Sequence, residues 1–120
     1  MAEYEIRVDD KGAYVVVTLI GAFASKGFAE LKQQLDALID ENRPVKRRRF
    51  LVFNLAESTL LTSSCLETMY AAKHRAEQQD IACVVIICSE EIRELFELTD
   101  FDRLFPIHES LDSFLLENDL

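Results

Sequence analysis

The sequence predicts an α/β domain with a mixed, mostly parallel β-sheet of about five strands and about four helices, in the order ββαβαβαβα. Residues 4–8 and 13–20 are two strand-like segments separated by a short turn, which is typical of a hairpin. Two nearly continuous apolar runs follow, at residues 50–55 and 81–88, and amphipathic stretches separate them, as in parallel sheets covered by helices. A length of 120 residues suits one domain, so we expect residues 1–120 to fold as a single unit.

The hairpin turn falls at residues 9–12, where Gly12 can take the positive φ that tight turns need. The second strand, residues 13–20, is rich in β-branched side chains, and Gly21 is expected to end it. A helix follows, with Ser25 as its N-cap and an Asn-Arg-Pro sequence as its stop. Its apolar residues recur at steps of three and four and so share one face: Phe28, Leu31, Leu35, Leu38 and Ile39.

The middle of the chain predicts two buried strands with a helix between them. The apolar run at residues 50–55 suits a central strand buried on both faces. In the helix that follows, Ser64 and Glu67 have the Ser-x-x-Glu spacing of a capping box. The helix is expected to end near residue 79, and residues 81–89 then form the second buried strand.

The C-terminal part predicts two shorter helices. Ser89 caps the first, and the acids Glu90 and Glu91 lie at the positive end of its dipole. Ser110 caps the second, after a short extended piece at residues 105–107. Their apolar sides consist of Ile92, Leu95 and Phe96 in the first and Leu111, Phe114 and Leu115 in the second.

The charge balance excludes several classes of partner. The chain carries 22 acidic and 13 basic side chains, a net charge of −9, and its isoelectric point is near 4.6. A general nucleic-acid binder needs clustered Lys and Arg, and docking on anionic lipid needs them too, so neither is expected. The first residues lack the basic start and apolar stretch of a signal peptide, and no apolar run is long enough to span a bilayer. We therefore expect a cytoplasmic protein without membrane insertion.

Motifs for catalysis, cofactors and metals are missing from the sequence. The three glycines fit neither a phosphate-binding loop nor a dinucleotide fingerprint. His74 and His108 lack a nearby Cys or His at metal-ligand spacing. Cys65 begins a helix, but His74 lies about 13 Å along that helix, too far for a nucleophilic pair. Cys83 and Cys88 are expected to be reduced, buried thiols, and we expect neither catalysis, a cofactor nor a metal.

Two polar segments leave alternatives open. The basic run Lys46, Arg47, Arg48 and Arg49 is either a solvated loop and strand start or a positive patch for an acidic partner. Three consecutive hydroxyl residues, Thr62, Ser63 and Ser64, precede the second helix. Either one of them caps the helix while the others face solvent, or the segment is phosphorylated, since a helix N-terminus accommodates a phosphate.

Two segments resemble one protein family, the STAS domain, which is the fold of bacterial anti-sigma factor antagonists. Residues 50–66, with the sequence FLVFNLAESTLLTSSCL, are similar to the family's strand, loop and Asp-Ser-Ser/Thr-Gly-Leu motif. Residues 92–107, with the sequence IRELFELTDFDRLFPI, resemble its Leu-Phe-x-x-Thr-Gly-Leu-x-x-Leu-Phe-x-Ile signature. Gly21 also lies where the family has a glycine after the second strand, and the element order agrees over nearly the whole chain.

The resemblance implies that Ser63 is the phosphoacceptor, with Ser64 as the alternative. Around the phosphosite, three positions depart from the family pattern: Thr62 replaces the motif's Asp, Cys65 replaces its Gly, and Ala24 replaces an acid that often follows the glycine of the second strand. The loss of both acids reduces repulsion toward a phosphate. A kinase that reads those acids, however, would not recognise this loop.

The resemblance also implies a non-catalytic regulator of a partner-switching pathway. Such a protein binds an anti-sigma factor that is also a serine protein kinase, loses it when Ser63 is phosphorylated, and regains it through a serine phosphatase. The alternative is a phosphorylation-independent interaction subunit of a lipid-transport or signalling assembly, which the altered motif favours. The hairpin edge also offers a strand for pairing with a second copy. The expected contact surface comprises Ser25, Thr62, Ser63, Ser64, Glu67 and Tyr70.

Overall fold

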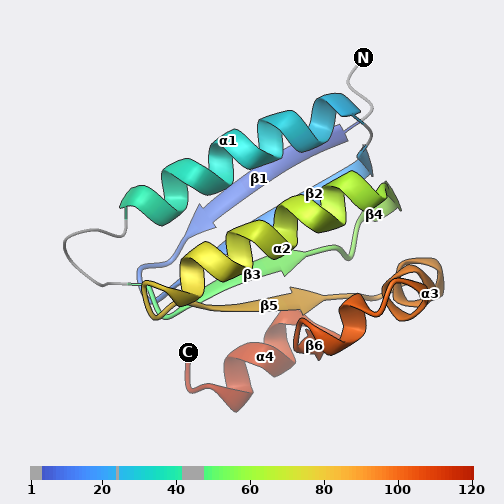
Figure 1. Ribbon diagram of the computed structural model, residues 1–120. Helices are drawn as coiled ribbons and strands as arrows, with labels where there is room; N and C mark the ends of the chain where they lie inside the picture. The colour runs from blue at the N-terminus through green and yellow to red at the C-terminus, as the bar shows by residue number, and fades with distance from the viewer. Residues whose placement is uncertain (1–3, 24, 42–47) are drawn as a thin grey trace.

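The computed structural model describes residues 4–23, 25–41 and 48–120, and within them it confirms the predicted fold class. Helices and strands alternate after an N-terminal hairpin (Figure 1). The elements are β1 (Tyr4–Asp10), β2 (Tyr14–Phe23), α1 (Ser25–Glu41), β3 (Phe50–Asn54), β4 (Ser58–Leu61), α2 (Ser63–Glu77), β5 (Ala82–Ile86), α3 (Glu90–Leu98), a short 3-10 helix η1 (Phe101–Arg103), β6 (Ile107–His108) and α4 (Leu111–Glu117).

The sheet has the strand order β1-β2-β3-β5-β6, and only the β1–β2 pair among its described strands is antiparallel. The central position of β3 and the burial of Leu51, Val52 and Phe53 confirm the prediction of a strand covered on both faces. A sixth strand, β4, was not expected from the sequence, and it pairs in parallel with the end of β2. β1 is an edge strand with charged side chains at Glu5, Arg7 and Asp9, and its pairing with a second copy stays a prediction.

Strand β2 continues past Gly21, so the prediction that this glycine ends the strand is wrong. The register shifts between Gly21 and Ala22, as at a β-bulge, and the strand runs on to Phe23. Gly21 has a φ of 88°, which a residue without a Cβ adopts at little cost, and its N–H donates to Glu57 O at 3.0 Å. The first part of β2 thus pairs with β3, and its last residues, around the register shift, pair with β4. Gly12, in the hairpin turn, has a φ of 84°, as its place in the turn predicted.

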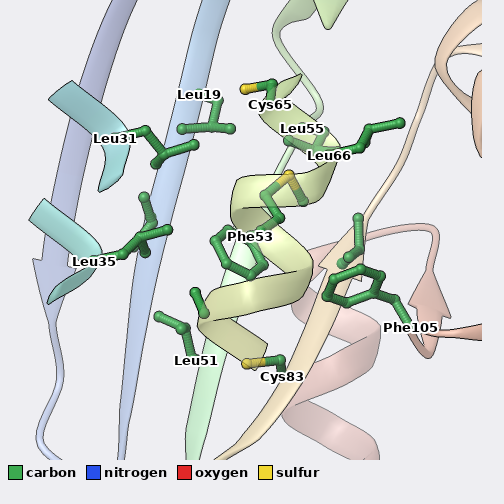
Figure 2. Packing of buried hydrophobic residues seen from close by; sticks show 14 of the residues in the cluster. Leu19, Leu31, Leu35, Leu51, Phe53, Leu55, Cys65, Leu66, Cys83 and Phe105 are labelled. Atoms are coloured by element: carbon green, nitrogen blue, oxygen red, sulfur yellow. The ribbon is translucent and has the colours of Figure 1, made fainter. Parts of the chain in front are cut away.

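Two hydrophobic clusters lie on the two faces of the sheet. Helices α1 and α2 lie side by side on one face, and the larger cluster fills the space beneath them, as the side chains in Figure 2 show. Helix α4 covers part of the other face, where Phe114 packs edge-to-face on Phe50 with ring centroids 5.1 Å apart. Phe53 and Phe105, both fully buried, extend the larger cluster toward α3 with ring centroids 6.2 Å apart. The core thus holds α1 and α2 in fixed positions over the sheet.

The basic run does not form a solvated patch at Arg48, which is only 5% exposed. Its guanidinium donates to Leu38 O at 3.0 Å and to Asp10 Oδ2 at 2.7 Å, so it joins α1 to the hairpin. Arg49 is exposed and lies over the Phe50 ring at 5.4 Å from its centroid. Lys46 and Arg47 lie outside the described residues.

Candidate functional site

The candidate site lies at the edge of the sheet where the parallel strands end. Strands β2, β4 and β5 lead within a few residues into α1, α2 and α3, so these helices begin at the same edge. Figure 1 shows β4, the beginning of α2 and α3 at one end of the molecule, and α3 packs beside β4. The hydroxyl residues at 62–64 therefore lie at the edge where these three helices begin, rather than in an isolated loop.

Thr62 is the N-cap of α2. Its backbone is extended, with φ −85° and ψ 163°, and its Oγ1 accepts a hydrogen bond from Cys65 N at 3.3 Å. The predicted capping box at Ser64 and Glu67 is wrong, because the helix begins earlier and Ser64 already lies inside it. Ser63 and Ser64 are the first two helical residues, and both are exposed. Thr62 thus caps the helix while Ser63 and Ser64 are exposed, and phosphorylation of the segment stays a prediction.

The residues predicted to form one contact surface lie on two different flanks of α2. Ser64 and Glu67 line a groove of about 390 Å³ between α1 and α2. Ser63 and Tyr70 are seven residues apart, two helical turns, and so share the other flank. There the Tyr70 ring lies 6.1 Å from the ring of Phe101, just after α3. The Ser25 side chain, and Ala24, lie outside the described part of the chain.

The groove flank has an apolar floor and paired charges. Phe28 and Leu35 of α1 face Ala71 and Ala72 of α2 across the groove. Three of its four charged lining residues are paired: Lys32 Nζ lies 3.1 Å from Asp36 Oδ2, and Arg75 binds both Asp36 and Asp40. The fourth, Glu67, forms no ion pair with a described residue. Burial raises the pKa of Asp36, but the hydrogen bond from Lys32 and the charge of Arg75 outweigh burial and hold that pKa below its ordinary value of 3.8.

The other flank, toward α3, has unpaired charges and exposed apolar side chains. Helix α3 carries four glutamates and one arginine, and Asp100 follows it. None of these five carboxylates forms an ion pair within the described residues: Glu90, Glu91, Glu94, Glu97 and Asp100. Leu98 at the end of α3 is 84% exposed, Leu60 of β4 is 53% exposed, and Tyr70 is 41% exposed. The sequence showed the acids and leucines, but not that α3 packs beside β4, the strand that leads into α2.

The cysteine next to the hydroxyl segment is not an activated thiol. Cys65 is completely buried beneath the start of α2 (Figure 2), and burial raises its pKa to about 12. Burial likewise raises the pKa of Cys83 to about 12. Cys88 follows β5, is exposed and donates to Glu109 O at 3.3 Å, so the prediction that it is buried is wrong. The strand ends before it reaches this position.

Within the described ranges, no three His, Cys, Asp or Glu side chains are grouped so that they could hold a metal ion. Among those same residues, no helix has the length and apolar character needed to cross a bilayer.

Comparison with known proteins places this geometry in context. The model of the STAS domain family matches residues 5–114. An anti-sigma factor antagonist from Mycobacterium paratuberculosis is 23% identical, with a TM-score of 0.81 over 95% of this chain and 92% of that one. The anti-sigma factor antagonist SpoIIAA in its unphosphorylated form is 10% identical, with a TM-score of 0.79 over 97% of this chain and 98% of that one. The Bacillus cell fate determinant SpoIIAA in its phosphorylated form is 11% identical, with a TM-score of 0.70 over 92% and 96%. No curated protein sequence matches at the significance level applied.

Proposed function

The chain belongs to the STAS domain family, and we propose that it is a non-catalytic, cytoplasmic regulator that works by partner switching. It binds an anti-sigma factor that is also a serine protein kinase, as a member of a signalling pathway that controls transcription. Phosphorylation of Ser63 releases that partner, and a serine phosphatase restores binding. Structures of anti-sigma factor antagonists share the fold of this chain, and one of these proteins, SpoIIAA, has been solved in a phosphorylated form.

The observation that carries the proposal is the position of Ser63. It is exposed, it opens α2, and the hydroxyl that caps the helix belongs to Thr62 instead. The Ser63 hydroxyl is thus available for modification without loss of the cap. Ser64 shares the exposure but lies toward the groove, so it stays the alternative acceptor.

A phosphate at Ser63 is compatible with the fold and still changes the surface. It adds a charge of about −1.5 to −2 close to the free N–H groups and the positive dipole end of α2. Residues 58–66 contain no charged side chain, so the modification adds an anionic group to an uncharged segment of the chain. A partner that covers this surface would have to bury that charge, and its affinity falls.

Binding to purified anti-sigma factor kinases of the source organism tests the proposal. We expect the wild type and Ser63→Ala to bind one such kinase, and Ser63→Asp to bind at least about tenfold more weakly, because a carboxylate would be desolvated in the contact. Ser64→Asp is the matched control, with the same charge one residue away on the groove flank. Equal binding by Ser63→Ala and Ser63→Asp would refute the switch.

Mass spectrometry of the protein from its native cells tests the modification itself. Phosphate on Ser63 in the presence of the kinase and ATP is the expected result.

The altered motif favours one other function more than an intact motif would, an interaction subunit that needs no phosphorylation, because Thr62 stands at the position of the motif's Asp. A chain that binds a transport or signalling assembly and never carries phosphate at Ser63 would support that alternative.

A further inference from the structure

We propose that the partner docks on the α3 flank of α2 rather than in the α1–α2 groove, and that its docking surface is apolar at the centre and basic at the rim. This α3 flank consists of Leu60, Ser63, Tyr70, Leu98 and the acids of α3. The inference rests on the proposed function, since it describes how the Ser63 surface recognises its partner. It assigns recognition to residues outside the hydroxyl segment, which is itself uncharged.

Glu90 and Glu91 lie in the first turn of α3, at the positive end of its dipole, but the other two glutamates of the helix have no such role. Glu94 and Glu97 are exposed, and neither forms an ion pair with a described residue. Most charges at the groove differ, because Lys32, Asp36 and Arg75 already neutralise one another, and Glu67 alone among the charged groove residues has no ion pair in the described ranges. Unpaired charges of one sign attract a partner of opposite sign and accelerate its approach. With several unpaired carboxylates against one at the groove, the α3 flank attracts a basic partner more strongly.

The apolar side chains of the α3 flank supply a contact centre. Leu98 is 84% exposed although it closes a helix whose other apolar residues are buried, as are Ile92 and Phe96, or half-buried, as is Leu95. Leu60 is 53% exposed on β4, which packs beside α3. Exposed leucines flanked by charges match the usual arrangement of an interface, in which an apolar centre is surrounded by a polar rim. Ser63 adjoins this centre, which explains why one phosphate there would disturb the contact.

Association kinetics with the same purified kinases, in the absence of ATP, test the inference. Glu97→Lys should lower the association rate about threefold to tenfold at low salt, and the loss should vanish near 1 M salt, where charges are screened beyond about 3 Å. A basic residue in the last turn of a helix is favourable, so this variant keeps its fold. Glu30→Lys is the matched control, with the same charge change at an exposed position of α1 away from the α3 flank.

Leu98→Ser should accelerate dissociation by about tenfold without changing the salt dependence, because it removes an apolar contact. Ala71→Gln, which puts a longer polar side chain into the groove, should bind like the wild type. Equal slowing by Glu97→Lys and Glu30→Lys would overturn the inference, as would a Leu98→Ser variant with wild-type kinetics or a large loss from Ala71→Gln. A wild type that binds none of the kinases would instead overturn the proposed function.

Discussion

The two flanks of helix α2 use charge in opposite ways. On the groove flank, Arg75 ties α1 to α2 through Asp36 and Asp40, and the groove floor is packed with apolar side chains. On the α3 flank, the carboxylates lack ion-pair partners among the described residues and Leu98 faces solvent. The charges that make up the net charge of −9 therefore have different roles on the two flanks. Most charges at the groove join α1 to α2, whereas Glu94 and Glu97 of α3 form no ion pair with a described residue and are left for contact with water or a partner.

The largest expected effect contrasts two leucines, one from each flank. Leu35→Ala should lower the free energy of unfolding by about 2–5 kcal/mol, because Leu35 is 1% exposed and its loss leaves a cavity beneath α1. Leu98→Ala should change it by less than about 0.5 kcal/mol, because this side chain is already in water. Urea unfolding of both variants measures the contrast. Similar losses would mean that the α3 flank also contributes to the fold.

The next effect concerns how closely α1 approaches the sheet. A Cβ at Gly27 would lie 2.7 Å from Cδ2 of the Phe23 ring, which is fully buried. Gly27→Leu should therefore lower the free energy of unfolding by about 1–3 kcal/mol through overpacking. Ala29→Leu, at an exposed position two residues along the same helix, is the control and should be nearly neutral. Thermal unfolding compares the two, and equal stability would show that α1 can shift outward freely.

The smallest effect depends on pH and comes from the paired charges. The pKa of Asp36 is below its ordinary value in the folded state, so the stability from this carboxylate is present above about pH 4 and is lost as pH falls through the folded-state pKa. Because both partners are partly exposed, Arg75→Gln should cost about 1 kcal/mol or less near neutral pH. Urea unfolding at neutral and acidic pH should show that difference shrink on acidification. Arg93→Gln on α3, without an ion pair in the described residues, should show no such pH dependence.

Much of the fold could be predicted because its signals are local. The hairpin, the buried strands β3 and β5, and the caps of the last two helices follow from residue types next to each other in the sequence. Strand β4 could not be predicted in this way. Its Ser58 is buried because the hydroxyl donates to Leu19 O at 2.6 Å, a partner 39 residues away, so a polar residue occupies a core position.

The candidate site was predicted in its chain position but not in its geometry. The residues of α2 that line each flank follow from the helical period, whereas the helix that faces each flank depends on tertiary packing. The cap was misassigned for a local reason. Thr62 and Ser64 are both residue types that cap helices, and the Ser-x-x-Glu spacing at Ser64 favoured the wrong one of the two. The burial of Arg48 could not be predicted from neighbouring residues, because its partners Leu38 and Asp10 lie 10 and 38 residues away in the sequence.

Asp100 shows how a departure from the family signature can keep the same backbone. The signature has Gly where this chain has Asp100, and the residue has a φ of 61°. Asp is among the few residues that adopt this left-handed conformation at modest cost. The turn into η1 is therefore retained, and the substitution adds one more carboxylate to the α3 flank.

The uneven burial of the cysteines gives the chain a built-in reporter position. Because burial raises the pKa of Cys65 and Cys83 to about 12, both thiols stay protonated near pH 7, and both lie out of reach of alkylating reagents. Cys88 is exposed, so a maleimide dye should attach there alone. Because Ser89 caps α3 directly afterwards, the dye would lie at the beginning of the acidic helix. Fluorescence from the unmutated sequence can therefore follow the arrival of a partner.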